Sequence, residues 1–393
     1  MSGPLTAIAW IMAGGVAVPL TVLIVEVAAG LVPGRRTQST DAAPRIAIVI
    51  PAHDEAQGIA ATLAALEPVS PAGTRVVVVA DNCSDDTAQI ARAAGAEVIE
   101  RQDPTRRGKG FALAFGRDHL AREAPPDVVI VLDADCRFAP GSVSALAGAA
   151  MARGVPAQAV NLIAPDPNAA PMVQISSFAM VVKNLFRSRG MQRLGGAALL
   201  TGTGMAFPWG LFAKAQLATG SIVEDLSLGI DLTRTGHPPL LVEGAQVRSA
   251  PAAMQDALQQ KRRWEHGFLD TLRRRALPVL GHGLRKTAWS EILLGLHLIV
   301  PPLALLVLLA TLALALTGGL ALLGGSAMPA LVLAFFLAVT SILLGAAWAV
   351  GGRHYLSPRA LLRAPLYVLW KLPIYAGFLK KPQASWNRTP RRE

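Results

Sequence analysis

Residues 128–135 read Val128-Val129-Ile130-Val131-Leu132-Asp133-Ala134-Asp135. Five apolar residues in a row are typical of a strand that is buried on both faces of a parallel sheet. Two carboxylates separated by one residue can share a hard divalent cation, which also holds phosphate oxygens. An Asp-x-Asp sequence that does not follow a buried strand is more often part of a solvated turn. Because a buried strand delivers both carboxylates to a loop, we predict a metal site at Asp133 and Asp135.

Two other apolar segments, 45–51 and 76–80, have the same character, and residues 59–66 between them have helical periodicity. This β–α alternation predicts an α/β domain with a mostly parallel sheet and helices on both faces. Such sheets bind their ligands at the carboxyl ends of the strands. The acidic residues that follow the predicted strands are Asp54, Glu55, Asp81, Asp133 and Asp135.

Three long apolar runs explain why only 16% of the 393 residues are charged and why the mean hydropathy is +0.42. They cover about residues 5–32, 291–317 and 329–350, and each is long enough to cross a bilayer core of about 30 Å. The second run contains Pro301-Pro302, which should kink it. We therefore predict one N-terminal and two C-terminal transmembrane helices.

The basic residues indicate how these helices are oriented. The formal net charge is +11, and Lys and Arg cluster beside the apolar runs, at 35–36, 273–286 and 353–392. Basic flanks mark the cytoplasmic side and attract anionic headgroups. We predict an N-terminus outside, a cytoplasmic globular domain and a multi-pass placement of the bacterial inner-membrane type. The same distribution favours membrane lipids, and not nucleic acid, as the basic residues' partner.

Two further segments mix apolar and basic residues. Residues 171–194 either lie in the headgroup plane or pack as a helix on the soluble domain. Residues 361–381 are either interfacial or a fourth span, which Lys371 near their centre disfavours. The predicted organisation is an anchor and linker at 1–42, a globular domain at 43–250, interfacial helices at 251–287, two transmembrane helices at 288–352 and a basic amphipathic tail at 353–393.

Two more motifs carry candidate chemistry. Glu224-Asp225 either opens a helix, where acids favour the macrodipole, or supplies Asp225 as a general base. Gln260, Arg263 and Trp264 fall on one side of a predicted helix within one turn. Arginine suits diphosphate oxygens, and an indole offers a flat face to a sugar ring. The alternative for this segment is a basic membrane-surface helix with a Trp anchor.

The two cysteines, Cys83 and Cys136, are far apart and have no CxxC spacing. They support neither a disulfide framework nor a zinc site.

Together these motifs resemble the membrane-bound family-two glycosyltransferases, which include cellulose, chitin and hyaluronan synthases and ceramide glucosyltransferase. The resemblance covers about residues 45–267. His53 and Asp54 depart from its usual aromatic and Asn, and Leu199 and Leu200 replace its usual aromatics. The matching segments, in chain order, are 50–55, 81–87, 107–110, Asp133 with Asp135, 202–204, Glu224-Asp225 and Gln260-x-x-Arg263-Trp264.

The resemblance implies a GT-A-type fold and an inverting hexosyltransferase that uses a nucleotide-diphosphate sugar, with a UDP-sugar as the expected donor. It implies that Asp225 is the catalytic base and that Asp133 and Asp135 hold Mg²⁺ or Mn²⁺. The implied donor-binding residues are Pro51, Ala52, Glu55, Asp81, Lys109, Asp133, Gln260, Arg263 and Trp264. The implied acceptor-binding residues are Gly202, Thr203, Gly204, Glu224 and Trp264.

The acceptor is not specified by these motifs. We favour a membrane-associated or growing glycan in cell-surface or exopolysaccharide synthesis, with single-sugar addition to a lipid, as in glycolipid synthesis, as the alternative. Outside this class, a noncatalytic membrane scaffold would not need Asp135, Asp225 and Trp264. A sugar nucleotidyltransferase could share the sheet and the metal pair, but would not need the Gln/Arg/Trp motif or the anchors. No pattern names the sugar or the oligomeric state.

Overall fold

The computed structural model describes residues 3–34, 44–218, 223–250 and 254–380, with residues 254–260 described by their backbone alone. Arg35, Arg36, the tail from residue 381 and the side chain of Gln260 lie outside this description. The chain forms two compact units. One, the membrane unit, comprises Met1–Pro33, Pro165–Gly196 and Lys261–Gln383. The other, the sheet unit, comprises Gly34–Ala164, Ala197–Gln260 and Ala384–Glu393.

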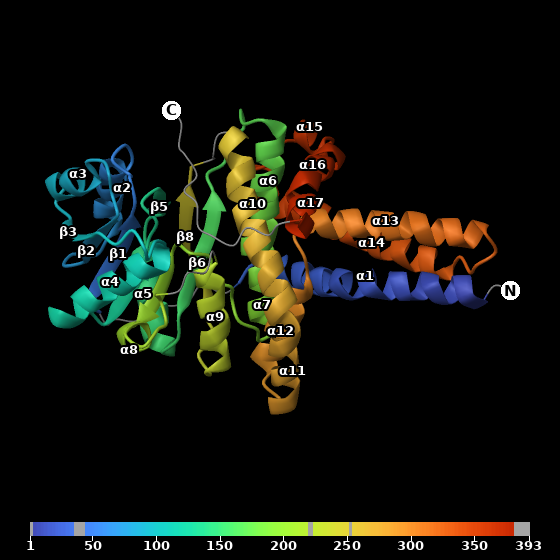
Figure 1. Cartoon of the computed structure of the whole chain (residues 1–393), viewed down its shortest axis with the longest axis horizontal. Helices are drawn as coiled ribbons and strands as arrows, with labels where there is room; N and C mark the ends of the chain where they lie inside the picture. Colours follow the sequence, from blue (N-terminus) through green and yellow to red (C-terminus); the bar gives the residue numbers. More distant parts are fainter. Residues whose placement is uncertain (1–2, 35–43, 219–222, 251–253, 381–393) are drawn as a thin grey trace. The chain divides into compact units, whose positions relative to one another are not determined.

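The sheet unit contains eight described strands in the order β3-β2-β1-β4-β7-β6-β8-β5 (Figure 1). Three strand pairs, β4–β7, β6–β7 and β5–β8, are antiparallel, and the other four are parallel. The predicted α/β class is confirmed, and the sheet is mixed because β7 runs antiparallel between β4 and β6. The strands are β1 (Ile46–Ala52), β2 (Arg75–Asp81), β3 (Glu97–Arg101), β4 (Val128–Val131), β5 (Cys136–Phe138), β6 (Ala157–Ile163), β7 (Met205–Pro208) and β8 (Leu240–Ser249).

Helices cover both faces of this sheet, because alternate strand residues enter two separate cores. Ile48 and Ile50 of β1 pack with residues of α2 (Ile59–Leu66) and α5 (Ser142–Arg153). Ala47 and Val49 of the same strand pack with residues of α4 (Lys109–Arg122), α8 (Trp209–Phe212) and α9 (Glu224–Arg234). The helix α3 (Thr87–Ala93) follows β2. The continuous apolar runs of β1 and β4 are therefore explained by burial on two faces.

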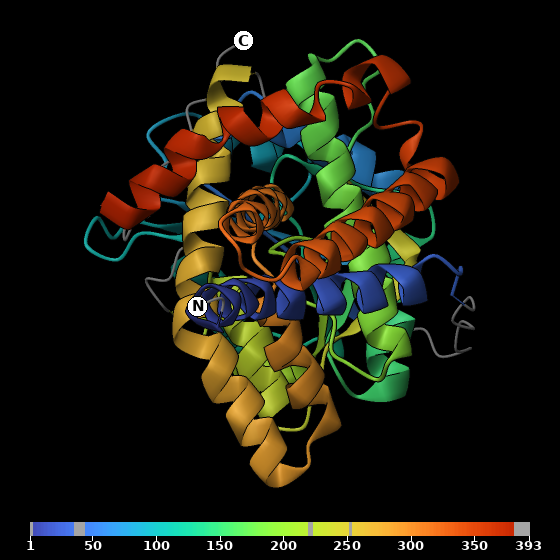
Figure 2. The same cartoon turned by 90° about the vertical axis from the view of Figure 1, so that its right-hand side faces the viewer.

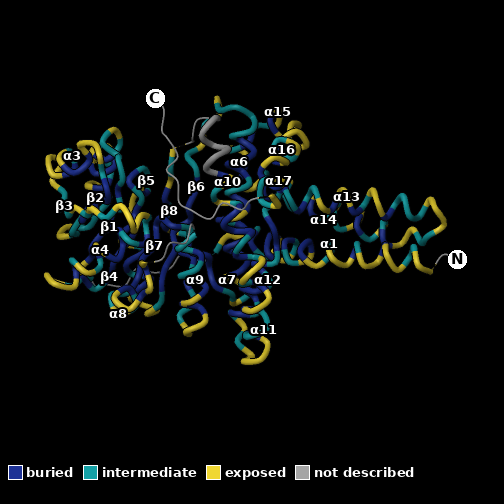
Figure 3. The backbone as a smooth tube through the Cα atoms, in the orientation of Figure 1, coloured by how far each residue is buried: buried dark blue, intermediate teal, exposed yellow. Residues whose placement is uncertain are grey.

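Among the described residues, three helices of the membrane unit are long and apolar enough to cross a membrane, the number predicted. They are α1 (Gly3–Gly30), α13 (Leu303–Leu322), and α14 (Met328–Ala347) continued by η4 (Trp348–Gly352). Figure 3 shows long exposed stretches along them, as lipid-facing helices require. The second span begins later than predicted: α12 (Trp289–Ile299) ends before Pro301 and Pro302, because proline has no amide hydrogen to continue a helix.

The predicted interfacial segment 171–194 packs against α1. It forms α6 (Pro171–Val181), η2 (Val182–Arg187) and α7 (Ser188–Arg193), and it belongs to the membrane unit, which contradicts the alternative of a helix on the soluble domain. Glu26, the one acid in the first apolar run, accepts hydrogen bonds from Arg187 Nε at 2.6 Å and from His297 Nδ1 at 2.7 Å. The buried carboxylate is thereby compensated.

The remaining helices of the membrane unit are short or amphipathic. They are η3 (Leu272–Ala276), α11 (Leu277–Lys286), α15 (Pro358–Leu361), α16 (Ala364–Trp370) and α17 (Leu372–Lys380), together with the part of α10 (Met254–Thr271) that begins at Lys261. Within this unit α11 and α12 run across the direction of α1, α13 and α14, as expected for helices in a membrane surface (Figure 1). The segment 361–381 divides at Lys371, and neither α16 nor α17 is long enough to be a fourth span.

Candidate active site

The acidic pair Asp133 and Asp135 lies in the loop between β4 and β5, where β4 ends. A carboxylate oxygen of each residue and Sγ of Cys136 lie within 4.8 Å of one another. Burial, and then the two carboxylates, raise the pKa of the Cys136 thiol well above its usual value, so the thiol stays neutral. Two carboxylate groups beside a neutral thiol fit a hard cation such as Mg²⁺ or Mn²⁺ and do not form a zinc-type thiolate set.

Lys109 brings a positive charge to this loop from the first turn of α4. Its Nζ donates hydrogen bonds to Asp133 Oδ1 and, at 2.7 Å, to the carbonyl oxygen of Gly202. Burial opposes the charge on Lys109, but the nearby carboxylates of Asp133, Glu224 and Asp225 outweigh it and raise the pKa. Lys109 is therefore protonated at neutral pH and lies among three acids from two segments that are far apart in sequence.

Gly202 lets the backbone approach these charges closely. Its φ is +86°, and a Cβ there would lie 3.3 Å from Asp225 Oδ2 and 3.4 Å from Lys109 Nζ. The next residue, Thr203, accepts a hydrogen bond at Oγ1 from the backbone N–H of Asp133 at 3.1 Å. The predicted acceptor segment, the predicted metal loop and the predicted base thus meet in the sheet unit.

Glu224 and Asp225 occupy the first turn of α9. The helix-start interpretation of this pair is therefore correct, and it does not exclude a chemical role, since Asp225 faces Gly202. Burial, and then the charge of Asp225, raise the pKa of Glu224 to about 7, with Lys109 acting in the opposite direction. Glu224 therefore holds its proton up to near neutral pH.

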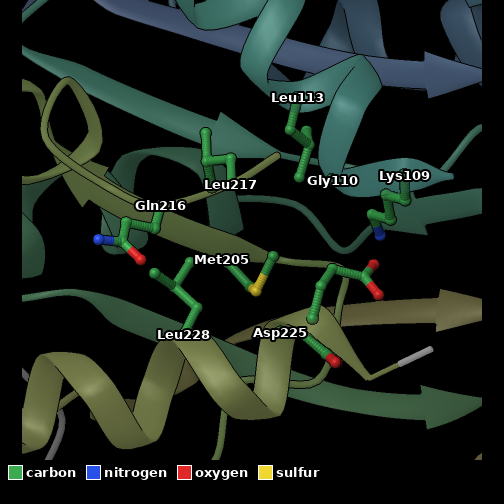
Figure 4. Close-up of a pocket in the computed structure, with 9 residues that line it drawn as sticks. Lys109, Gly110, Leu113, Met205, Gln216, Leu217, Asp225 and Leu228 are labelled. Atoms are coloured by element: carbon green, nitrogen blue, oxygen red, sulfur yellow. The ribbon is translucent and has the colours of Figure 1, made fainter. Parts of the chain in front are cut away.

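A small cavity opens beside this group, with charged side chains at one end and apolar side chains along most of its remaining wall. Figure 4 shows Lys109 at one end and Gln216 at the other, with Met205 and Leu217 between them. The complete lining is Lys109, Gly110, Leu113, Met205, Gln216, Leu217, Glu224, Asp225 and Leu228.

The residues predicted to bind the nucleotide lie at the carboxyl ends of β1 and β2. Pro51 and Ala52 end β1, and Asp81 ends β2. The backbone N–H of Glu55 donates to Thr87 Oγ1 at 2.7 Å, at the start of α3. Since β1 and β2 are parallel neighbours, these residues share one edge of the sheet with Asp133 at the end of β4.

Two of the departures from the family pattern, His53 and Asp54, have local structural roles. Asp54 has φ +51°, a left-handed conformation that Asp tolerates better than most residues, and its Oδ1 accepts from the backbone N–H of Ser84 at 2.6 Å. His53 Nδ1 lies 2.7 Å from the carbonyl oxygen of Asp81, to which it donates when it carries the proton. Both residues therefore link the turn after β1 to the end of β2.

Sequence reasoning missed two residues that organise the site. Arg101 of β3 forms an ion pair with Asp81 at 2.6 Å, with both side chains nearly buried. Gln158 of β6 accepts from Thr201 N at 3.0 Å and donates to Thr203 O at 2.9 Å, which fixes the loop that contains Gly202. The available signal was weak: Gln158 is a polar residue inside an otherwise mostly apolar strand.

The structure thus brings together Lys109, Asp133, Gly202 and Asp225. Arg263 and Trp264 belong to the membrane unit, where Trp264 is exposed on α10.

Comparison with known proteins supports this reading. A family model described as "Glycosyltransferase like family 2" matches residues 44–267. An uncharacterized glycosyltransferase of Mycobacterium tuberculosis is 37% identical over 90 residues, which are 23% of this chain and 36% of that protein. The low-salt glycan biosynthesis hexosyltransferase Agl6 of Haloferax volcanii is 36% identical over 103 residues, 25% of this chain and 23% of that protein. The chain therefore spans about a third or less of these relatives.

A mannosyltransferase of Pyrobaculum calidifontis, solved with GDP-Man and Mn²⁺, has a TM-score of 0.58 and 17% identity. The superposition covers 96% of this chain and 100% of that chain. At this identity the likeness shows the fold, and the predicted GT-A-type architecture is confirmed.

Proposed function

The chain belongs to glycosyltransferase-like family 2, and on that premise we propose that it is an inverting, metal-dependent hexosyltransferase that uses a nucleotide-diphosphate sugar, with a UDP-sugar as donor. The observation that carries the proposal is the meeting of Lys109, Asp133 and Asp225 around Gly202. A transferase of this kind needs positive charge near the leaving diphosphate and a base near the attacking hydroxyl. Lys109 and Asp225 offer these two functions within one small region.

On the donor side, Asp133 and Asp135 would hold Mg²⁺ or Mn²⁺, which would supply positive charge to offset the charge on the departing nucleoside diphosphate. Lys109 adds a fixed positive charge on the same side, because the nearby carboxylates keep it protonated. Pro51, Ala52, Glu55 and Asp81 bind the nucleotide at the ends of β1 and β2. Gln260, Arg263 and Trp264 complete the donor site.

On the acceptor side, Asp225 takes the proton from the attacking hydroxyl. The new glycosidic C–O bond forms as the bond from the anomeric carbon to the diphosphate oxygen breaks, and attack from the opposite face inverts the anomeric carbon. Lys109 stabilises the ionised form of Asp225 before the transfer. Gly202, Thr203, Gly204, Glu224 and Trp264 bind the acceptor, and the absence of a side chain at Gly202 leaves room beside Asp225 Oδ2.

We propose that the catalytic domain is cytoplasmic, with the N-terminus outside, and that the acceptor is a membrane-associated or growing glycan. Three helices long and apolar enough to span a membrane support a reaction at its surface. Single addition to a lipid is the second candidate. It is favoured by the apolar part of the cavity next to Asp225, which is lined by Leu113, Met205, Leu217 and Leu228.

The test is a screen of nucleotide sugars with the purified full-length protein in detergent. Release of nucleoside diphosphate together with a glycosylated product supports the proposal, and release of pyrophosphate would make the protein a nucleotidyltransferase instead. The product separates the two acceptor candidates, since a ladder indicates repeated addition and a single band indicates one addition. Asp231→Asn, on the exposed side of α9, is the matched control for substitutions of Asp225.

A further inference from the structure

The helix α10, which carries Arg263 and Trp264, is held from another side by buried charges. Glu265 follows Lys261 by four positions, one turn of the helix, and the two side chains therefore lie on one face of α10. Glu265 forms an ion pair with Lys371, at the junction of α16 and α17, and the two side chains are 13% and 6% exposed. Lys261 is also buried. We refer to Lys261, Glu265 and Lys371 as the α10 charge cluster.

Aromatic rings and a backbone hydrogen bond extend this contact. Lys261 Nζ lies 5.8 Å from the ring centroid of Trp370, and Lys371 Nζ lies 5.1 Å from that of Tyr367. His266 Nε2 lies 2.8 Å from the carbonyl oxygen of Ile374, the geometry of a hydrogen bond that the ring donates. Figure 2 shows the C-terminal helices, in red, reaching α10, in gold. The contact therefore fixes α10 both by charge and by packing.

Glu265 has to balance two ammonium groups in this cluster. Burial, and then the charge of Lys371, lower the pKa of Lys261 to about 7. For Lys371, burial acts in the same direction, but Tyr367 and Glu265 outweigh it and raise the pKa. Breaking a buried pair is costly because it leaves an uncompensated charge. Removal of Glu265 should accordingly do more damage than removal of Lys371, whose loss leaves Lys261 near the carboxylate.

We propose that Glu265 and Lys371 are positioning residues for glycosyl transfer, which fix the rotation of α10 and thereby the orientation of Arg263 and Trp264. The inference rests on the proposed donor contact of these two residues. Arg263 lies on the opposite side of α10 from Lys261 and Glu265, and Trp264 lies on an adjoining side, since successive residues are about 100° apart around a helix. A rotation of α10 would therefore displace both donor contacts together, and misplacement by about 1 Å costs about 10²-fold in rate.

The experiment compares Lys371→Met and Glu265→Gln with Lys380→Met, which removes an exposed lysine from α17, the helix that follows Lys371. We expect Lys371→Met to lower kcat/KM by roughly 10²-fold, mainly through a higher KM for the donor, with Lys380→Met unchanged. Glu265→Gln should lose more, and Lys261→Met added to Glu265→Gln should recover part of the loss. An unchanged donor KM in Lys371→Met, with only less folded enzyme, would overturn the proposal.

Trp264→Ala separates failure of this inference from failure of the proposed donor contact. If Trp264→Ala keeps wild-type KM and kcat, the donor contact itself is wrong, and the inference fails with it. If Trp264→Ala is impaired while Lys371→Met and Glu265→Gln behave like Lys380→Met, the donor contact stands and the positioning role is wrong. Impairment of all three, with Lys380→Met unaffected, supports both.

Discussion

Asp225 is the residue to which the proposed reaction assigns the proton transfer. Replacement by Asn keeps the shape and removes the basicity, so we expect Asp225→Asn to lower the transfer rate by about 10²–10⁴-fold. Donor affinity should persist, because the nucleotide is bound by other residues. Product formation and titration calorimetry with the donor measure the two effects. Loss of both in Asp225→Asn, but not in Asp231→Asn, would make Asp225 a structural residue.

Glu224 should make stability depend on pH. Its pKa in the folded protein is raised to about 7, whereas a free Glu has about 4.3. The folded state therefore holds the proton more tightly, and the resulting stabilisation is complete below pH about 4.3 and is lost as the pH rises through about 7. We expect the melting temperature, without metal or donor, to fall between pH 5 and 8, and Glu224→Gln to reduce this fall. An identical pH profile in the variant would contradict the assignment.

A substitution at Gly202 tests whether the backbone must come close to Asp225 and Lys109, and a control glycine separates this effect from backbone strain. Gly202→Ala places a side chain at φ +86° and against Asp225 and Lys109, whereas Gly236→Ala places one at φ +85° with nothing within 4 Å. Both should lose about 1–2 kcal/mol of stability from the left-handed backbone. Only Gly202→Ala should also lose transfer activity. Equal activity of the two variants would remove the segment 202–204 from the acceptor site.

At the level of residues, the sequence was most informative where a residue type and its chemistry coincide. Asp133, Asp135 and Asp225 could be proposed because their motifs are local in sequence. Two of these carboxylates directly follow an apolar strand, and the third belongs to an acidic pair at a helix start. Arg101 and Gln158 could not be proposed, because each acts through a partner that is distant in sequence, Asp81 or Thr203, and single-sequence patterns contain no information on such pairs.

At the level of elements, the attachment of α1 to η2 and α7 depends on glycine. A Cβ at Gly30 would lie 1.9 Å from the carbonyl oxygen of Phe186, and a Cβ at Gly190 would lie 1.9 Å from that of Glu26. A backbone oxygen cannot move aside as a side chain can. Gly30→Ala should therefore force the helices apart and cost about 1–3 kcal/mol or more.

The control for Gly30→Ala is Gly14→Ala on the same helix, where a Cβ meets nothing within 4 Å. Thermal unfolding of both variants in detergent measures the difference. We expect Gly30→Ala to melt at a lower temperature than the wild type and Gly14→Ala to melt at the same temperature as the wild type. If both melt like the wild type, the close contact of α1 with η2 does not contribute to stability.

The elements themselves were predicted best where the pattern was continuous. The apolar runs of β1, β2 and β4 and the periodicity of α2 gave their positions within one or two residues. The strands β3, β5, β6, β7 and β8 were not predicted, and β5 and β7 are too short, at three and four residues, to show a periodicity. The break between α12 and α13 was expected only as a kink, since a proline pair in an apolar run does not reveal whether the helix resumes in line.

At the level of the whole molecule, hydropathy separated a membrane unit from a sheet unit. The number of candidate spans followed from run length, because the bilayer sets a minimum helix length. The membership of residues 171–194 in the membrane unit could not be predicted, because it depends on the pairing of Glu26 with Arg187 and His297 across long distances in sequence. Orientation, donor and acceptor remain proposals that rest on charge placement and on the site.

The most direct test is the rate of sugar transfer by the purified protein in excess chelator, before and after Mn²⁺ or Mg²⁺ is returned. Wild-type protein should stop in chelator and recover with either ion, and Asp135→Asn should not recover at the same metal concentration. Full activity in excess chelator would contradict the account. It would mean that transfer does not need the metal ion that Asp133 and Asp135, beside Lys109, are proposed to hold.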